Sequence, residues 1–466
     1  MHCVLTIDFG STYTKAAAID VGEGVVLATA EDFTTAATDV SLGLEKALHK
    51  LHAQTGSLSY EAKLACSSAA GGLAMIACGL VPSLTAKAAR FAAYGAGAKV
   101  IGTYAYELTE EDAAEIARCN PDILLLTGGT DGGNREVIEY NANVIAGIDA
   151  AFPVIIAGNR NAQAACAAIL RQSGHPVYLA DNVMPSLNEL NVQPAQQIIR
   201  EVFLERIILS KGLSEVQELT DGIMMPTPAA VLAALTLLAE GTKQYPGLGE
   251  LMAVDLGGAT TDIYSIAKGT PVLQATLLSG LREPYIKRTV EGDIGMRYGA
   301  RGIVAAAGMD ALEELSGLTS DEAEALLRCL EDDPSLLPET DREHAMDFAL
   351  AALAVRTGMV RHAGTLREVY TPMGAVYQQT GKDLTGINLM ILTGGALIHG
   401  NRSEEVVRAA IDINDPWKLI PRNPTIKKDT QYILASMGLL AGYDKEAAFR
   451  ILNQTFGKDD DDGTCQ

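Results

Sequence analysis

The stretch Asp8-Phe-Gly-Ser-Thr-Tyr-Thr-Lys15 decides the fold, because a version of it returns later in the chain as Asp255-Leu-Gly-Gly-Ala-Thr-Thr-Asp262. Each copy follows a short apolar run, at residues 3–7 and 251–254, and each precedes a second apolar run. Asp, Gly and Thr fall at the same three offsets in both copies. The pattern predicts a buried strand, a tight turn and a returning strand, built twice in one chain.

Such a turn could bind an anion, because a turn rich in Gly, Ser and Thr presents backbone N–H groups and hydroxyls to one phosphate. In the first copy, Asp8 stands at the strand end and suits a hydrated Mg²⁺, while Lys15 suits a terminal phosphate. For this turn in isolation, an ordinary hairpin whose Asp and Ser bond their own backbone is an equal alternative. The repeat favours the phosphate interpretation, because two facing hairpins could hold one nucleotide from both sides.

A third pattern is Met390-Ile-Leu-Thr-Gly-Gly-Ala-Leu397, an apolar strand that opens into Gly394 and Gly395. Without side chains there, the backbone could approach a flat ring or a ribose closely. Its Leu-Thr-Gly-Gly core has an earlier counterpart at residues 126–129, which opens a glycine-rich loop at residues 127–134. That loop either shapes its domain, the interpretation we favour, or forms a ligand or partner surface at the end of a parallel strand.

Length, composition and charge limit the class of protein. The chain has 466 residues, of which 48% are hydrophobic and 20% charged, and this suits two folded domains. The formal net charge of −22 argues against binding nucleic acid or a membrane surface through a basic face. The seven cysteines include no C-x-x-C pair, which is typical of reduced thiols in a cytoplasmic protein. The apolar stretch 223–239 contains two prolines and is too short to span a membrane.

The order of apolar segments predicts an α/β protein with a first domain at 1–245 and a second at 246–466. Inserted βα units occupy about 63–210 of the first domain, with strands expected at residues 100–104, 123–126, 154–157 and 177–179. Thr319-Ser-Asp-Glu322 and Thr340-Asp-Arg-Glu343 have the capping-box pattern of helix starts. The sequence leaves open whether the C-terminal helix packs with the first domain. Residues 459–466 are expected to be a solvated acidic tail.

Together, the two hairpins and the diglycine strand resemble the actin, Hsp70 and sugar-kinase superfamily of ATPases. This resemblance implies a duplicated actin-like, ribonuclease H-like fold, with two domains around a nucleotide cleft and connecting segments at 291–298 and 435–440. It also implies ATP and Mg²⁺ as cofactors. A narrower resemblance, carried also by the loop 127–134 and by Glu291-Gly-Asp-Ile-Gly-Met-Arg297, is to the glutamate (methylaspartate) mutase accessory family GlmL, also called MutL.

The superfamily resemblance implies roles for particular residues. Asp8 and Asp255 would organise Mg²⁺ and the attacking water, and either Glu291 or Asp293 would help to orient that water. Asp262 is expected to brace its hairpin rather than to contact the metal. The expected phosphate and adenosine contacts are Gly10, Ser11, Thr12 and Lys15 from the first hairpin, Gly257, Gly258, Thr260 and Thr261 from the second, and Gly394 and Gly395 beside the adenosine.

The narrower resemblance implies an ATP-dependent reactivating factor for an adenosylcobalamin-dependent mutase, which exchanges damaged for intact cobalamin through ATP-driven domain closure. The chain lacks the Asp-x-His-x-x-Gly pattern of a base-off cobalamin-binding domain, so the cobalamin is expected on the partner enzyme. A small-molecule kinase and an actin-like scaffold controlled by ATP are the alternative functions. The sequence leaves open which cobalamin enzyme is the partner, and it leaves the oligomeric state open.

Overall fold

The computed structural model describes residues 2–10, 12–34, 40–68, 73–207, 220–221, 223–372 and 374–457. The chain divides into two compact units, the first with the described residues of 1–249 and 431–466, the second with those of 250–430. The C-terminal helices therefore cluster with the first unit, which is the return to the first domain that the sequence left open for the end of the predicted second domain. The predicted acidic tail lies outside the described residues.

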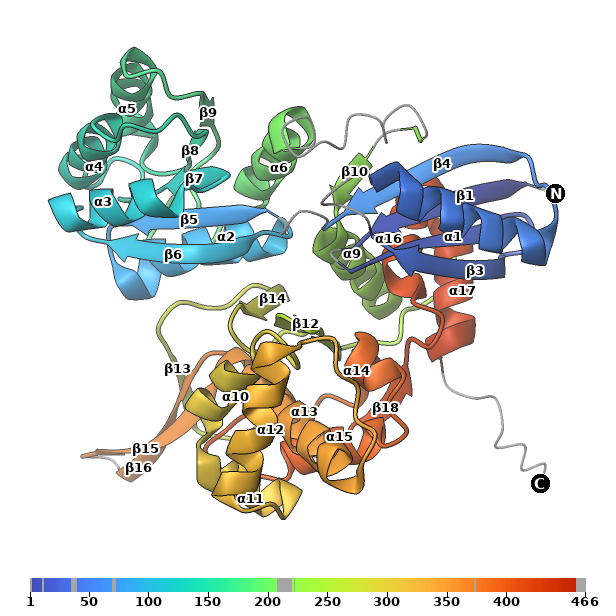
Figure 1. Cartoon of the computed structure of the whole chain (residues 1–466). Helices are drawn as coiled ribbons and strands as arrows, with labels where there is room; N and C mark the ends of the chain where they lie inside the picture. The colour runs from blue at the N-terminus through green and yellow to red at the C-terminus, as the bar shows by residue number, and fades with distance from the viewer. Residues whose placement is uncertain are drawn as a thin grey trace. The chain divides into compact units, whose positions relative to one another are not determined.

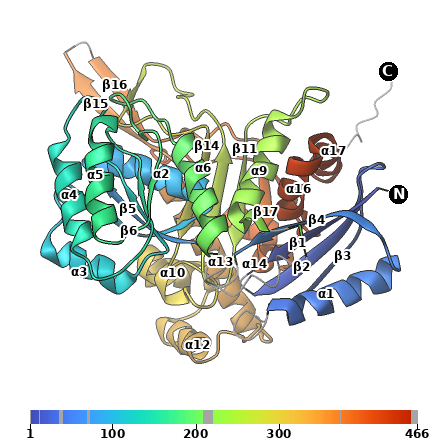
Figure 2. The same ribbon diagram turned by 90° about the horizontal axis from the view of Figure 1, so that it is seen from above.

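The first unit contains a mixed five-stranded sheet, whose strands β1 to β4 are labelled in Figure 2. Its strands are β1 (Cys3–Phe9), β2 (Tyr13–Asp20), β3 (Val25–Phe33), β4 (Tyr60–Ser67) and β10 (Ile223–Pro226). The order across the sheet is β3-β2-β1-β4-β10, in which β2 is antiparallel to β1, and β4 is parallel to it. β1 is buried along its whole length, which explains its mostly apolar run before Asp8. Helix α1 (Val40–Thr55) packs on β2 and β3.

The second unit repeats this sheet. Its strands are β11 (Leu251–Leu256), β12 (Thr261–Ile266), β14 (Ile286–Glu291), β17 (Leu389–Thr393) and β18 (Thr425–Lys428). The order is β14-β12-β11-β17-β18, with β12 antiparallel and β17 parallel to β11. Numbered along the chain within each sheet, both orders read 3-2-1-4-5. The shared order confirms the predicted duplicated α/β fold.

An inserted α/β region separates β4 from β10 in the first unit (Figure 1). Its strands are β5 (Ala74–Gly79), β6 (Lys99–Ala105), β7 (Ile123–Leu126), β8 (Val154–Ile156) and β9 (Val177–Leu179). Its helices are η2 (Pro82–Ala86), α2 (Lys87–Gly95), α3 (Glu110–Cys119), α4 (Glu136–Ala146), α5 (Arg160–Gln172), α6 (Gln193–Val202) and η3 (Phe203–Ile207). The sheet is parallel in the order β6-β5-β7-β8-β9, which is the doubly wound order of flavodoxin-like folds. The predicted parallel sheet is therefore confirmed.

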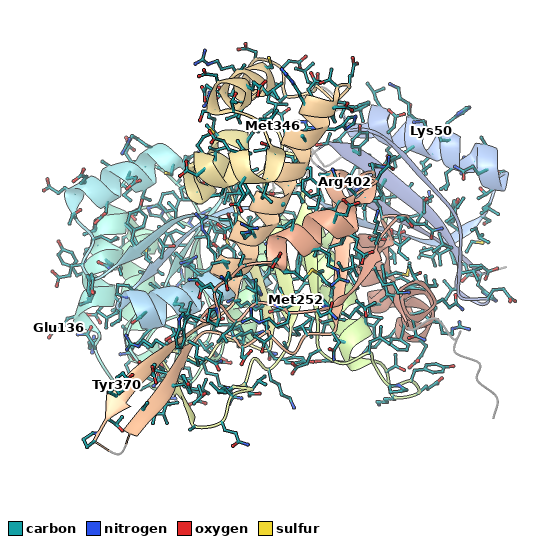
Figure 3. The ribbon with its side chains drawn as sticks, turned by 90° about the horizontal axis from the view of Figure 1, so that it is seen from below. Lys50, Glu136, Met252, Met346, Tyr370 and Arg402 are labelled. Carbon is teal, nitrogen blue, oxygen red and sulfur yellow. The ribbon has the colours of Figure 1, made fainter. Side chains whose placement is uncertain are left out.

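Helices cover the sheet of the second unit. They are α10 (Ala300–Ala307), α11 (Met309–Ser316), α12 (Ser320–Asp332), α13 (Asp341–His362), α14 (Gly395–Ile398) and α15 (Ser403–Ile411). Both predicted capping boxes are present, at Thr319 before α12 and at Thr340 before α13. Met346 of α13 and Met252 of β11, both labelled in Figure 3, belong to one buried core. This core anchors β11, the strand that carries Asp255.

The second unit also contains a small, separate three-stranded sheet. It contains β13 (Thr276–Ser279), β15 (Thr365–Thr371) and β16 (Gly374–Thr380) in the order β13-β16-β15. Tyr370 near the end of β15 is 80% exposed (Figure 3). The small sheet therefore adds little to the core that supports Asp255.

Two helices of the first unit, α9 (Thr227–Glu240) and α16 (Ile433–Tyr443), pack against each other (Figures 1 and 2). The helices approach closely at Gly438, where an added Cβ would lie 1.8 Å from the carbonyl oxygen of Ala230. α9 holds most of the apolar stretch 223–239 and buries it inside the unit. Among the described residues, no helix is both long and apolar enough to span a membrane. Helix α17 (Lys445–Phe456) follows α16.

Candidate nucleotide-binding site

The first predicted hairpin joins β1 to β2. The N–H of Gly10 donates a hydrogen bond to the carbonyl oxygen three residues later at 3.1 Å, which closes the turn. A Cβ at Gly10 would lie 2.6 Å from the same oxygen, so the turn requires glycine there. Asp8 faces Lys15 across the two strands. Thr12 is exposed at the turn, and Ser11 lies outside the described residues.

The second hairpin, between β11 and β12, closes in the same way. The N–H of Gly257 donates to the carbonyl oxygen of Thr260 at 3.0 Å, the counterpart of the bond in the first hairpin. Asp255 faces Asp262 across the strands. The position that holds Lys15 in the first hairpin is therefore acidic in the second.

Asp8 is buried at the end of β1 and receives hydrogen bonds from two distant segments. The hydroxyl of Thr227, the first residue of α9, donates to Oδ1 of Asp8 at 2.5 Å. The thiol of Cys66 on β4 donates to the same oxygen at 3.5 Å. Burial raises the pKa of Asp8 above its ordinary value, and the charge of Lys15 and these two donors oppose that rise. A buried carboxylate of this kind would gain strongly from a bound cation.

The ammonium of Lys15 lies 3.8 Å from the centroid of the Tyr432 ring. Among the described residues, the Lys15 ammonium has no hydrogen-bond or ion-pair partner. Tyr432 precedes α16 and has a φ of 53°, in the left-handed region. Lys15 is therefore held by a ring face, and its N–H groups are open to an anion.

Asp255 lies beside the diglycine turn in the second unit. It faces Thr393 in the parallel register of β11 and β17. Gly394 follows with a φ of +87°, and an added Cβ would lie 2.6 Å from Oδ1 of Asp255 and 2.4 Å from the carbonyl oxygen of Leu256. Only glycine fits this conformation and this space. The structure therefore brings the predicted adenosine-flanking Gly394 next to Asp255, and Gly395 follows it as the first residue of α14.

The stretch after β14 wraps the second hairpin. The N–H groups of residues 296–298 donate to the carbonyl oxygens of Gly257 and Gly258 at 2.8 to 3.1 Å. A Cβ at Gly295 would lie 2.3 Å from the backbone of Ala259, which explains the glycine in this segment. The prediction that residues 291–298 connect the two domains is wrong, because the segment lies inside the second unit. The chain passes between the units at 249–250 and 430–431, after α9 and before α16.

The two candidate water-orienting carboxylates have different surroundings. Glu291 forms an ion pair with Arg361, with 2.5 Å between Oε2 and Nη1. Asp293 is exposed in the turn that follows β14. Thr261, opposite Glu291 across the strands, is fully buried and donates to the carbonyl oxygen of Ile294 at 2.7 Å. The Thr261 hydroxyl is thus engaged within the protein, and Asp293 is the more accessible carboxylate.

Asp262 forms a buried ion pair with Arg288 of β14. Its Oδ1 lies 2.5 Å from Nη2 and 2.7 Å from Nε of Arg288. The hydroxyl of Thr260 donates to the other oxygen at 3.4 Å. The pKa of the nearby Tyr264 is well above its usual range, mainly because of burial and also because of the charge of Asp262. Asp262 therefore braces the hairpin, as expected.

Asp8 and Asp255, the predicted magnesium ligands, stand at the ends of β1 and β11, one in each unit. Within the described ranges, no group of three His, Cys, Asp or Glu side chains could hold a metal ion. Mg²⁺ usually keeps several waters and is bound through one or two carboxylates together with substrate phosphates. Single carboxylates at the ends of β1 and β11 suit that mode of binding.

The glycine-rich loop 127–134 is held by two asparagines from neighbouring strand ends. The amide of Asn159 donates to the carbonyl oxygens of residues 133 and 134 at 3.1 Å each. The amide of Asn182 donates to the carbonyl oxygen of Gly129 at 3.0 Å and to Oδ1 of Asp131 at 2.9 Å. These bonds support a structural role for the loop.

Solved structures show a broad likeness at low scores. The activator of the 2-hydroxyisocaproyl-CoA dehydratase from Clostridium difficile, with bound ADPNP, is 10% identical, with 96% of each chain covered and a TM-score of 0.31. Ligand-bound xylulose kinase from Lactobacillus acidophilus is 11% identical, with 98% of this chain and 92% of that chain covered and a TM-score of 0.36. Scores this low carry no argument about function.

Sequence comparison establishes the family. Protein MutL of Clostridium tetanomorphum is 44% identical over 457 residues, which are 97% of this chain and 99% of that protein. The model of a family described as MutL protein matches residues 4–456. These matches confirm the narrower resemblance found in the two hairpins and the glycine-rich loop. The chain therefore belongs to the MutL protein family.

Proposed function

We propose that this protein hydrolyses ATP and uses it to reactivate an adenosylcobalamin-dependent mutase similar to glutamate mutase. The observation that carries the nucleotide part is the recurrence of one aspartate-bearing hairpin at the same place in two sheets of the same order. Family membership, together with the resemblance to mutase accessory proteins, supports the cobalamin part. The partner would carry the cobalamin.

In this proposal the two hairpins bind the phosphates, and the diglycine turn flanks the adenosine. The contacts would come from Gly10, Ser11, Thr12, Lys15, Gly257, Gly258, Thr260, Thr261, Gly394 and Gly395. Lys15 is the one cationic side chain in the two hairpins. Because the hydroxyl of Thr261 already donates to the carbonyl oxygen of Ile294, the phosphate contact of Thr261 would come from its backbone.

Asp8 and Asp255 would act through Mg²⁺ and its ordered waters. Bound Mg²⁺ supplies charge neutralisation for the phosphates. Asp293, or Glu291 after release from Arg361, would orient the attacking water. As the water oxygen bonds to the γ-phosphorus, the bond to the β–γ bridging oxygen breaks, which yields ADP, phosphate and a proton passed to solvent.

The coupling to the partner would follow from nucleotide-dependent closure of the two units. A triphosphate bound by both hairpins would favour one arrangement of the units, and loss of the γ-phosphate would remove part of that preference. A surface that changes between the two arrangements could open the mutase for cobalamin exchange. The six described cysteines are free thiols, which supports the cytoplasm as the compartment in which this occurs.

The test measures ATP turnover with and without a glutamate mutase that is inactive because its bound coenzyme is damaged. We expect ATP-dependent recovery of mutase activity when intact adenosylcobalamin is supplied. The Asp8→Asn and Asp255→Asn variants should fail to restore activity. Equal recovery without ATP, or rapid phosphorylation of an added hydroxyl compound with no recovery, would contradict the proposal.

A further inference from the structure

We infer that Tyr432 is a positioning residue for the proposed nucleotide reaction, because its ring holds the ammonium of Lys15 ready for a phosphate. The inference rests on the proposed function. Lys15 follows the first hairpin and faces Asp8 across the strands, and its nitrogen lies 3.8 Å from the ring centroid. The ring belongs to a segment more than four hundred residues away in the sequence.

The ring contact suits a phosphate-binding lysine better than a salt bridge would. An aromatic face attracts a cation without using its N–H groups, whereas a salt bridge would engage them in hydrogen bonds to a carboxylate. The Lys15 ammonium makes no hydrogen bond or ion pair with the described residues, so its N–H groups could bond phosphate oxygens. Holding a flexible lysine in one rotamer before binding also lowers the entropy that the phosphate contact must overcome.

The backbone of Tyr432 supports a dedicated role for the ring. Its φ of 53° and ψ of 40° lie in the left-handed region, which bulky residues rarely adopt. Such strain is typical of positions at functional sites. The conformation places Tyr432 directly before α16, just after the passage between the units at 430–431.

The same helix pair also reaches Asp8. α16 packs on α9, and the first residue of α9, Thr227, donates to Asp8. The two charges beside the first hairpin, Asp8 and Lys15, are therefore each held at the start of one of these helices. A phosphate that binds Lys15 would therefore affect Tyr432, the residue before α16, which follows the boundary between the units at 430–431.

The experiment compares ATP binding, by calorimetry in the presence of Mg²⁺, for the full chain and two variants. Tyr432→Leu removes the ring face and should weaken ATP binding about tenfold, which corresponds to about 1.4 kcal/mol. Tyr432→Phe keeps the ring and should stay within about twofold of the original protein. In the Lys15→Met background, Tyr432→Leu should have no further effect, because the cation is already gone.

A matched control removes a different cation–ring contact in the same unit. Lys87 lies 5.4 Å from the Phe91 ring centroid, and Lys87→Met should leave ATP binding unchanged. If Tyr432→Leu fails to fold, Tyr432→Met serves as the second variant without a ring. Unchanged or tighter ATP binding in the ring-free variant would overturn the inference while the proposed function stands.

A readout without nucleotide separates the two proposals. The ring should shift the proton resonances of the Lys15 ε-methylene upfield in the original protein and in Tyr432→Phe, but not in Tyr432→Leu. If the original protein binds no ATP, the proposed function fails, and the positioning role fails with it even if this shift is seen. If ATP binds and the shift is absent, the ring contact itself is contradicted.

Discussion

Thr227 donates a hydrogen bond from its hydroxyl to Oδ1 of Asp8 at 2.5 Å, although the two residues are 219 positions apart in the chain. The bond joins the start of α9 to the end of β1. Because Asp8 is buried and its pKa is raised, each donor to its ionised form has a large effect on the charge state. The carboxylate expected to hold Mg²⁺ is thus controlled by a residue outside the hairpin.

Thr227→Val should destabilise the protein more at high pH than at low pH. Burial raises the pKa of Asp8 in the folded state, so stability falls as pH rises from the unfolded pKa through the folded pKa. Loss of the donor raises the folded pKa further and enlarges this fall. At about pH 8 we expect a loss of about 1.5–3 kcal/mol in the free energy of unfolding, measured by urea denaturation.

Thr227→Ser is the control, because it keeps the hydroxyl donor. It should behave like the original protein at both pH values. At about pH 4, where more of Asp8 is protonated, the two variants should differ less than at pH 8. A difference of the same size at both values would show that packing, and not the charge of Asp8, causes the effect.

Asp8→Asn and Asp255→Asn should each abolish most ATP hydrolysis while the protein remains folded. Each change removes the negative charge that would hold Mg²⁺ in one unit, and we expect the turnover number to fall about a hundredfold or more. The control is Asp32→Asn, which removes a carboxylate paired on β3 with Lys50 at 2.8 Å. Turnover by either hairpin variant near that of the control would contradict the assigned metal role.

Local sequence patterns correctly predicted the strands of both hairpins, four strands of the inserted sheet, the capping boxes and the repeated hairpin turns. These features depend on residues close together in the chain, such as the glycine that closes each hairpin at the third residue after it. The glycine at 394 was also predictable, because an apolar strand that ends in two glycines indicates close backbone approach.

Contacts between distant segments could not be predicted in this way. Nothing near Asp8 in the sequence indicates that Thr227 or Tyr432 reaches the hairpin, and nothing near Asp262 indicates Arg288. The connecting role of segment 291–298 was carried over from the superfamily resemblance, whereas the structure shows the segment wrapped tightly around Gly257 and Gly258. Only the tertiary packing distinguishes the two.

Gly394→Ala should weaken ATP binding and destabilise the second unit. The new Cβ would lie 2.6 Å from Oδ1 of Asp255, and the φ of +87° is unfavourable for alanine. We expect a loss of about 1–3 kcal/mol in stability together with weaker ATP binding. Gly386→Ala is the control, since no atom lies within 4 Å of its added Cβ. Equal ATP affinity in the two variants would contradict the place of the diglycine turn at the nucleotide.

Lys382, a buried lysine in the second unit, should give the protein a pH-dependent stability. The amine of Lys382 donates to the hydroxyl of Ser265 at 3.2 Å and to the carbonyl oxygen of Tyr285 at 2.8 Å. The pKa of Lys382 is lowered from its ordinary value of 10.5 to about 7, mainly because of burial and also because of the charge of Lys287. Lys382 is therefore largely neutral in the folded protein at mildly alkaline pH.

Lys382→Met should remove a pH dependence of stability. Between about pH 7 and 10.5 the unfolded chain binds more protons at Lys382 than the folded chain, so stability contributed by this site rises with pH. The slope can reach about 1.4 kcal/mol per pH unit. The free energy of unfolding of the original protein, relative to Lys382→Met, should increase across this range. The exposed Lys268, changed to Met, should leave the profile unchanged. A constant difference between Lys382→Met and the original protein would mean that Lys382 is charged in the folded state, which its burial beside Lys287 argues against.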